Sequence, residues 1–254
     1  MKLFYFFIIF TSLNLSHAFA SEIDLGDVEW IHLYHDQPMY FLLGSPETKV
    51  QFSFKEKIVS TSNFYIAYTQ RMFWDLFAPS APFIDINYNP SVYYRIYVDD
   101  DKKTILDLIP IEHESNGKNS LDSRSWNRVG ARYLTTHRFD NGFKLLGSVR
   151  AWVPFSDSST NPDLAHYRGI YEIEITLSDF LGKYFDLNDL CLRFYSGGQS
   201  DVNPFMGGQE LTLRLKGHAV AFLANAVFQI FQGYAENMLN YRQKVWGMRA
   251  GFGI

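Results

Sequence analysis

The sequence predicts an all-β fold, a twelve-stranded antiparallel transmembrane β-barrel, and three observations carry this prediction. Most of the chain after residue 48 alternates apolar with polar residues, which is the period of a strand. The alternating segments run for roughly 10 to 14 residues, whereas soluble strands average five or six. The apolar face is rimmed with Tyr and Trp while the other face carries opposite charges, as in a barrel with lipid outside and a polar interior.

Composition excludes several other classes of protein. The 254 residues are 17% aromatic and only 20% charged, which argues against a disordered or coiled-coil chain. Nucleic-acid binding needs a basic face, and a formal net charge of −4 argues against one, so we expect no nucleic-acid partner. One cysteine excludes an intrachain disulfide framework and a multi-cysteine zinc site. A mean hydropathy of −0.14 excludes a polytopic helical membrane protein but not a barrel.

The first twenty residues predict an export signal. Lys2 precedes an apolar run over 3–10, and Ala18-Phe19-Ala20 supplies a small-x-small cleavage pattern. A membrane anchor is the alternative, but the apolar run is short for a span. We therefore expect a cleaved signal peptide over 1–20, a polar periplasmic segment over 21–37 and a barrel domain over 38–254.

Twelve segments account for the barrel. In the last of them, Trp246, Met248 and Phe252 alternate with Arg249 and three glycines, so that one face is apolar and the other small or charged. A soluble β-sandwich also alternates, and the segment lengths and the charged face weigh against it. In chain order the predicted strands are 38–44, 49–60, 62–75, 83–99, 102–115, 123–137, 142–154, 166–178, 187–197, 207–216, 218–232 and 241–254.

Two of the predicted strands have unusual sequences. The segment 218–232 is uncharged and is also compatible with a helix, although Asn225, Gln229 and Gln232 would make a poor spanning helix. Pro110 lies inside another segment, where it removes a ladder hydrogen bond. A β-bulge is therefore expected at Pro110.

The stretch 111–128 carries the candidate chemistry. His113 and Ser115 are two residues apart on a strand, so both point to one face, where an imidazole can activate a hydroxyl. A turn then brings the next strand back, which places Asn127 beside His113 as the acceptor of a ring N–H. Backbone N–H groups around Ser115 and Gly117 are available to an oxyanion.

Taken by themselves, these features also have plainer interpretations. A His-x-Ser pair on a strand is more often ordinary surface than a catalytic pair. The loop 118–123 is rich in side-chain and carbonyl oxygens, which suit a hard cation such as Ca²⁺, but polar loops of this kind are common.

A family resemblance favours the catalytic interpretation. The string His-Glu-Ser-Asn-Gly at 113–117, followed by Ser-Arg-Ser-Trp-Asn-Arg at 123–128, closely resembles the signature of the outer membrane phospholipase A family of Gram-negative bacteria. The resemblance covers essentially 38–254. It implies a twelve-stranded barrel in the outer membrane with the active site on its lipid-facing wall. Further matching positions are Tyr68-Thr69-Gln70 with Trp74, Asn87-Tyr88 with Pro90, Asn161-Pro162-Asp163, and Gly233-Tyr234.

The resemblance implies a role for each residue of the site. Ser115 is the nucleophile, His113 the general base and acid, and Asn127 the residue that orients the imidazole. The N–H groups of Ser115 and Gly117 bind the oxyanion, together with water on a bound Ca²⁺.

The same resemblance implies a Ca²⁺ site that is shared between two copies of the chain. Its ligands are the Ser123 hydroxyl, the Lys118 carbonyl and a carbonyl from the other copy at Ser80. Gln70 lies in an apolar stripe, where an unsatisfied amide is unfavourable. A twofold interface or headgroups and water would both satisfy it, and the resemblance favours the interface of a homodimer.

The implied activity is calcium-dependent hydrolysis of the sn-1 and sn-2 acyl esters of glycerophospholipids, and of lysophospholipids, through an acyl-enzyme on Ser115. A transport porin is the first alternative. Twelve strands give a narrow lumen, however, and charged side chains would fill it. A catalytically inactive barrel is the second alternative, and all three triad positions being present argues against it. The inward-facing charged residues are Arg128, Arg132, Arg150, Arg168, Glu172 and Glu174.

Overall fold

The structure is a computed structural model that describes residues 33–34, 36–59, 61–99, 101, 103–157, 159–185, 187–200, 202–216 and 225–254. The expected signal peptide over 1–20 and most of the polar segment over 21–37 lie outside these residues. Within the described part of the chain, no helix is long and apolar enough to cross a membrane.

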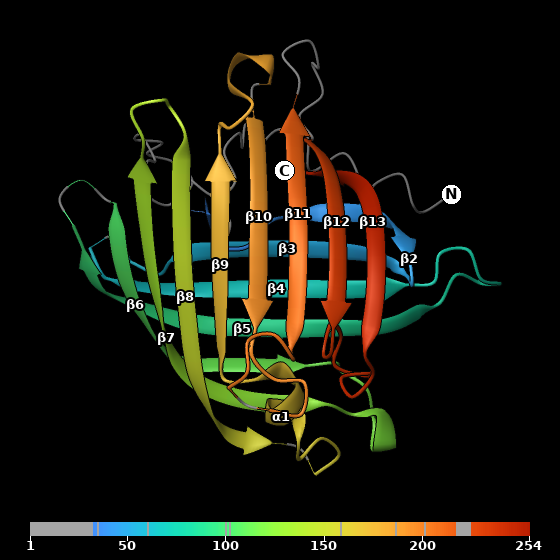
Figure 1. Ribbon diagram of the computed structural model, residues 1–254. Helices are drawn as coiled ribbons and strands as arrows, with labels where there is room; N and C mark the ends of the chain where they lie inside the picture. The colour runs from blue at the N-terminus through green and yellow to red at the C-terminus, as the bar shows by residue number, and fades with distance from the viewer. Residues whose placement is uncertain are drawn as a thin grey trace.

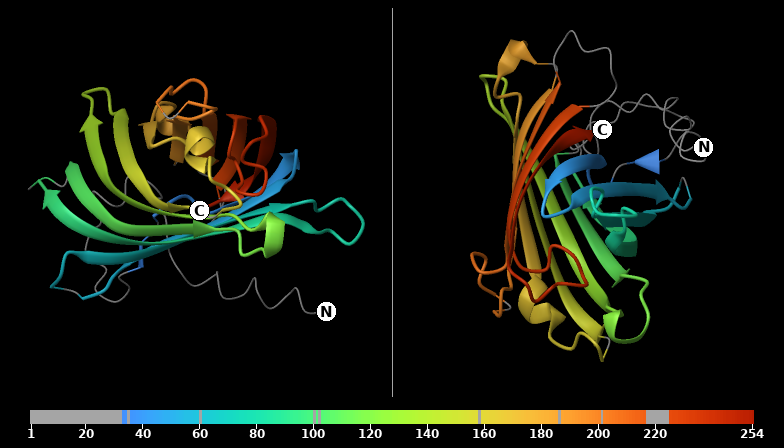
Figure 2. Two further views of the ribbon diagram at one scale, coloured as in Figure 1. Left: turned by 90° about the horizontal axis from the view of Figure 1, so that it is seen from below. Right: turned by 90° about the vertical axis from the view of Figure 1, so that its right-hand side faces the viewer.

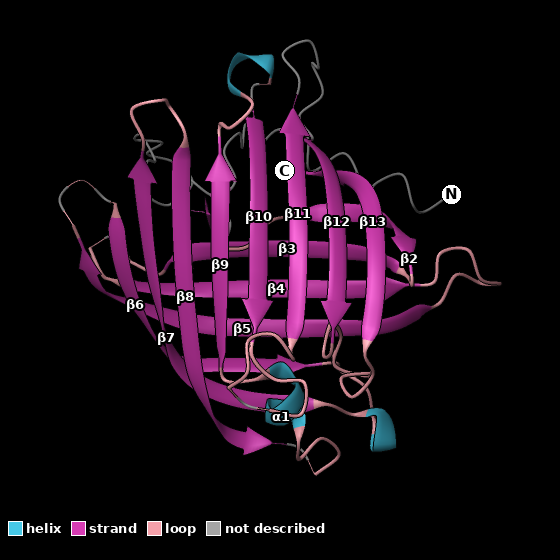
Figure 3. Ribbon diagram, in the orientation of Figure 1, coloured by secondary structure: helices cyan, strands magenta, loops and turns pink. Residues whose placement is uncertain are grey.

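Almost all of the described chain is strand, with short helical turns between strands (Figure 3). The helical elements are α1 (Leu164–Arg168) and single 3₁₀ turns at Ser120–Asp122 and Gly182–Tyr184. The strands are β1 (Leu33–Tyr34), β2 (Tyr40–Ser45), β3 (Thr48–Lys57), β4 (Phe64–Trp74), β5 (Phe83–Val98), β6 (Thr104–Ser115), β7 (Ser125–Arg138), β8 (Lys144–Asp157), β9 (Tyr171–Ser178), β10 (Leu187–Tyr195), β11 (Gly208–Lys216), β12 (Asn225–Gly233) and β13 (Val245–Gly253) (Figure 1).

The strands close into a barrel. Each strand from β2 onwards pairs antiparallel with the next, and β13 pairs with β2, which joins the two ends of the wall. Figure 2 shows β2 and β13, in blue and red, side by side at this seam. The short β1 pairs with the end of β3 that β2 does not reach, so β1 and β2 share one position in the wall. The predicted twelve-stranded antiparallel barrel is confirmed.

Two details of the prediction are also settled. The segment 218–232 is a strand, β12, over the residues that are described there. Between β6 and β7 the register shifts between Ile109 and Glu112, which is the bulge expected at Pro110. The pairing then resumes with Glu112 opposite Arg128.

One predicted strand begins too early. The sequence predicts a strand over 166–178, but β9 begins only at Tyr171, and α1 occupies part of the expected strand. Gly169 ends α1 with φ +74°, and its N–H donates to the Ala165 carbonyl (2.7 Å). Alternation of apolar residues continues through this break, so the pattern does not reveal it.

The barrel has its polar residues inside and its apolar residues outside. On β12 and β13 the inward Gln229 and Arg249 are 1% and 2% exposed, while the outward Phe228 and Met248 are 50% and 52% exposed. A soluble sandwich has the opposite arrangement, since it buries its apolar face. The outer wall therefore offers a surface suited to hydrocarbon.

Charged hydrogen bonds fill much of the lumen. Glu112 accepts from Arg128 (2.5 Å) and from Arg150 (2.6 Å), and Glu172 accepts from Arg168 (2.7 Å). Glu174, by contrast, lines a cavity of about 80 Å³, and its Oε1 is buried without a hydrogen bond to any described residue.

Asp36 also lies inside the lumen, although the sequence places it in the polar segment ahead of the barrel. Its carboxylate accepts hydrogen bonds from Arg132 (3.1 Å) and from the Tyr93 hydroxyl (3.1 Å), and lies 3.8 Å from Lys55 Nζ. The chain therefore enters the barrel interior before its first long strand.

Candidate active site on the outer wall

The end of the barrel that carries α1 also carries the β6–β7 loop, and the C-terminus lies at the opposite end (Figure 1). On β6, Glu112 and Glu114 point inward and are 1% and 4% exposed. His113 and Ser115 therefore point outward from the same strand. The outward neighbours Ile111 and Val129 are 50% and 43% exposed, so the pair lies on an apolar wall.

His113 and Asn127 meet across the β6–β7 ladder. They are directly opposite in register, and His113 Nδ1 lies 2.9 Å from Asn127 Oδ1. With the ring proton on Nδ1, this N–H donates a hydrogen bond to Asn127 Oδ1, and Nε2 is left as the basic nitrogen. The structure therefore brings this predicted pair together with the geometry that an orienting residue needs, and its catalytic role stays a prediction.

Ser115 is the last residue of β6 and is half-buried. It lies about 7 Å along the strand from His113, on the same face, which is the ordinary spacing of alternate strand residues. Its ladder partners are Ser125 on β7 and Tyr88 on β5. Ser115 thus has His113 two residues before it on its own strand and Tyr88 opposite it on β5.

Gly117 has a conformation and surroundings that require glycine. Its φ is +63°, and a Cβ atom placed on it would lie 2.8 Å from Cε2 of Tyr88. The backbone can therefore turn sharply just after Ser115, which is where an oxyanion-binding N–H is expected.

The buried side chain of Asn116 forms three of the hydrogen bonds that hold the β6–β7 loop closed. Asn116 is 3% exposed, and its Oδ1 accepts the backbone N–H groups of Arg124 (2.9 Å) and Lys118 (3.4 Å). Its Nδ2 donates to the Asp122 carbonyl (2.9 Å). These bonds fix the backbone beside both expected Ca²⁺ ligands of this loop, Lys118 and Ser123.

The donor atoms of the expected calcium site suit a hard cation. The carbonyls of Lys118 and Ser80 and the hydroxyl of Ser123 form no hydrogen bond with any residue that the structure describes. Ser80 is exposed on the β4–β5 loop with φ +65°. The part of the chain that is described contains no group of three or more His, Cys, Asp or Glu side chains placed to hold a metal. Neutral oxygens, which Ca²⁺ accepts, are therefore the ligands available here.

Gln70 lies on the outward face of β4, as predicted. Tyr68, two residues away on the same face, donates its hydroxyl to Gln70 Oε1 (2.9 Å). The Gln70 amide nitrogen donates to no residue in the described part of the chain. One half of this amide is therefore satisfied within the chain, and the other half is available to an outside acceptor.

Sequence reasoning assigned no role to two residues that support the site. Asn161 is fully buried, and its side chain bonds both the N–H (2.9 Å) and the carbonyl (3.0 Å) of Ser125, where β7 begins. Trp126 is 1% exposed and lies between Ser125 and Asn127 on the inner face. Asn161 is part of the matched string Asn161-Pro162-Asp163, but no local pattern shows that a residue 36 positions away would dock on β7.

Three comparisons relate this chain to known proteins. The family model of phospholipase A1 matches residues 32–254. A phospholipase A1 from Klebsiella pneumoniae is 30% identical over 180 residues, which cover 69% of this chain and 57% of that protein. The chain thus spans little more than half the length of the curated relatives that it matches.

Solved structures show the same fold. Outer membrane phospholipase A from Escherichia coli superposes with a TM-score of 0.70 at 22% identity, over 91% of this chain and 94% of that one. The outer membrane phospholipase of Salmonella typhi, crystallised as a dimer with bound calcium, gives a TM-score of 0.69 at 22% identity, over 90% of this chain and 94% of that one.

Proposed function

The chain belongs to the phospholipase A1 family, and on that premise we propose that it hydrolyses acyl ester bonds of glycerophospholipids in the outer membrane of a Gram-negative bacterium. The observation that carries the proposal is the His113–Asn127 hydrogen bond on an apolar outer wall, with Ser115 two residues along. A catalytic pair that faces lipid has direct access to acyl chains, whereas a transport pore needs no such groups on its outside.

In the proposed mechanism, His113 removes the proton of the Ser115 hydroxyl as that oxygen attacks the ester carbonyl. Asn127 holds the imidazole in the tautomer that leaves Nε2 basic, and the Gly117 N–H donates to the oxyanion. His113 then protonates the leaving alcohol, and a water molecule, deprotonated by His113, releases the fatty acid from Ser115. We expect both sn-1 and sn-2 esters, and lysophospholipids, to be substrates.

A divalent cation is part of the proposal. Lys118 and Ser123 of one copy would hold Ca²⁺ together with the Ser80 carbonyl of a second copy, and the bound ion would polarise water near the oxyanion. The Salmonella typhi relative, a dimer with bound calcium, supports this part of the proposal. Without a bidentate carboxylate, the affinity for Ca²⁺ should be modest.

A homodimer would satisfy the free half of the Gln70 amide. At a twofold interface the amide nitrogen meets its own copy or a nearby backbone group, instead of hydrocarbon. Dependence on a second copy would also keep a lone molecule inactive within a membrane made of its substrate. Export through a cleaved signal peptide over 1–20 completes the proposal.

The direct test is release of fatty acid from a phospholipid in detergent, combined with covalent labelling by a sulfonyl fluoride. We expect calcium-dependent release and labelling at Ser115. Excess chelator should abolish release, while the unheated protein still migrates as a folded barrel on a gel. Full activity in chelator would contradict the calcium role, and labelling at another residue would contradict the assignment of Ser115.

The dimer has a separate test. Gln70→Cys should crosslink to its own copy in intact membranes when phospholipid is driven into the outer leaflet, and crosslink poorly otherwise. Full calcium-dependent activity from a protein that stays monomeric would contradict this part of the proposal.

A further inference from the structure

The β12–β13 connection folds into the barrel behind the catalytic strands. Ala235, Glu236, Asn237, Met238 and Tyr241 are all buried. We propose that residues 235–241, called the inner brace below, act as a positioning element that holds the two neighbours of β6 in register and so sets the geometry of the outer-wall triad. The inference rests on the proposed function, because the triad is what the brace would position.

The inner brace is bonded to β5. The Met238 N–H donates to Asn87 Oδ1 (3.2 Å), and the Leu239 N–H donates to Asp85 Oδ2 (2.9 Å). Both acceptors are buried, and Asn87 Nδ2 also donates to Asp85 Oδ2 (2.6 Å). Asn87 adjoins Tyr88, which pairs with Ser115 in the ladder and lies against Gly117. The contacts on the inner face of β5 therefore lie next to the residue that pairs with the nucleophile.

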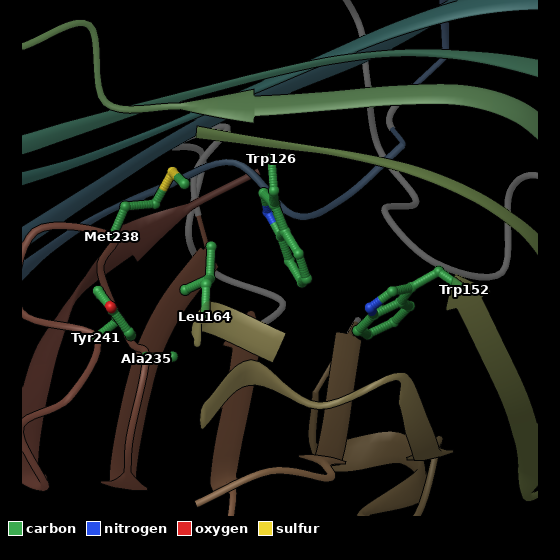
Figure 4. Packing of buried hydrophobic residues seen from close by; sticks show 6 residues of the cluster. All are labelled: Trp126, Trp152, Leu164, Ala235, Met238 and Tyr241. Carbon is green, nitrogen blue, oxygen red and sulfur yellow. The ribbon is translucent and has the colours of Figure 1, made fainter. Parts of the chain in front are cut away.

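The inner brace also packs against β7. Figure 4 shows Met238, Tyr241 and Ala235 grouped with Trp126, Trp152 and Leu164 in one buried cluster. Trp126 precedes Asn127 in the chain, and its ring lies edge-on to Trp152 with centroids 6.3 Å apart. The brace thus contacts the strand that carries the residue hydrogen-bonded to His113.

The nucleophile strand β6 is tied into the same group of contacts. Glu114, between His113 and Ser115, accepts from Trp126 Nε1 (3.1 Å), Arg71 (2.6 Å) and Arg128 (3.0 Å). Strand side chains alternate between the two faces, so a twist of the backbone at Glu114 would also change the direction of the His113 and Ser115 side chains. The inner contacts therefore set the direction in which the outward side chains point.

The brace is itself anchored, so it can transmit position. Glu236 accepts two hydrogen bonds from Arg249 (2.6 and 3.1 Å) and lies 3.3 Å from Lys49 Nζ. The Ala235 N–H donates to the Tyr241 carbonyl (3.1 Å), which closes the segment on itself. A displacement of about 1 Å at reacting groups is enough to slow a reaction roughly 100-fold.

The test compares Asp85→Ala with Asp85→Asn, which keeps an acceptor for the Leu239 N–H. Asp189→Ala is the matched control, because Asp189 is a buried lumen carboxylate that accepts from Arg214 (2.7 Å) on a distant wall. We expect Asp85→Ala to lower kcat and the rate of sulfonyl fluoride labelling of Ser115 by about 10- to 100-fold with little change in KM. Asp85→Asn should recover most of this loss, and Asp189→Ala should retain the wild-type labelling rate.

Folding is checked by the mobility shift between unheated and heated samples on a gel. If Asp85→Ala does not fold, Met238→Ala decides, because it removes side-chain packing of the brace in the buried cluster that contains Trp126 and keeps the backbone N–H that donates to Asn87. Wild-type labelling rates in the folded brace variant would overturn the inference. Absence of Ser115 labelling in the wild type would instead refute the proposed function, so the two failures are distinguishable.

Discussion

The outer and inner faces of the β6–β7 pair are built in opposite ways. The outer face carries neutral groups joined by a single side-chain hydrogen bond among the described residues, between His113 and Asn127. The inner face is charged, and Glu112 and Glu114 accept six hydrogen bonds from the surrounding side chains, most of them from arginines. The hydrogen bonds that hold these two strands in place are thus formed mainly inside the barrel, and the outer face is left open to substrate.

This difference shows how a site on a lipid-facing wall can be rigid without being enclosed. A buried carboxylate is stable only when its hydrogen bonds are nearly complete, which fixes its direction. The strand backbone passes that direction to the alternate side chains. Outer-face substitutions should therefore change activity and leave stability intact, whereas inner-face substitutions far from the site should do the reverse.

The largest effect is expected for Ser115→Ala. Loss of the nucleophile removes the covalent route, so activity should fall by about three to six orders of magnitude. The barrel should still show the heat-dependent mobility shift, because the Ser115 hydroxyl contributes nothing to the lumen network. Ser125→Ala is the matched control, since Ser125 is the cross-strand neighbour with the same side chain, and it should retain activity. Comparable losses in both variants would contradict the assignment.

Substitutions on the inner face away from the site should lower the stability of the barrel. Asp107 is fully buried and accepts from Arg95 (2.9 and 3.2 Å) and from Arg132 (3.0 Å). Asp107→Ala leaves the partly buried Arg95 without its carboxylate partner, so we expect a loss of about 3–5 kcal/mol in the free energy of unfolding. Asp107 lies about 27 Å along β6 from Ser115, at 3.4 Å per residue. Activity per folded molecule should therefore stay near wild type, and a denaturant titration with parallel assays would check both values.

A smaller effect is expected for Asn127→Ala. His113 keeps its proton chemistry in this variant and loses mainly its orientation, so activity should fall by about 10- to 100-fold. Asn127→Asp restores an acceptor for the ring N–H and should recover part of the loss. Equal activity in the alanine and wild-type proteins would show that the 2.9 Å contact has no catalytic role.

The sequence predicted what depends on local alternation. It assigned His113 and Ser115 to one face and placed Asn127 opposite His113, because strand side chains alternate and a short loop fixes which residues of the two strands meet. The same rule predicted that Arg128 and Glu172 point into the lumen. These features follow from a few residues on each side, so distant parts of the chain hardly influence them.

The features that the sequence missed depend on distant contacts. Met238 bonds Asn87, 151 residues away, and Asp36 reaches Arg132 across the lumen. The start of β9 was missed because Gly169 interrupts the strand while the apolar alternation continues. Loops lack a periodic sequence pattern, so their paths cannot be predicted from alternation. Their paths depend on the buried residues that they contact once the barrel has closed.

The smallest effect is expected for Arg242→Ala, just beyond the inner brace. Arg242 donates three hydrogen bonds to Asp163 (3.2, 2.9 and 2.6 Å), but its side chain is 55% exposed. Burial disfavours charged Asp163, yet hydrogen bonds from Arg242 and Tyr241 outweigh it and hold the pKa of this carboxyl below its ordinary value. An exposed pair of this kind contributes at most about 1 kcal/mol.

The pH dependence of this pair follows from the lowered pKa. Because the folded-state pKa of Asp163 lies below its unfolded-state value, the stabilisation is complete at neutral pH and is lost as pH falls through the folded-state pKa. Wild type should therefore exceed Arg242→Ala in unfolding free energy by up to about 1 kcal/mol at neutral pH and low salt, and the two should converge in acid and in high salt. A difference that persists in acid would mean that Arg242 stabilises the loop through its contact with the Tyr241 ring, 5.1 Å away, and not through its pairing with Asp163.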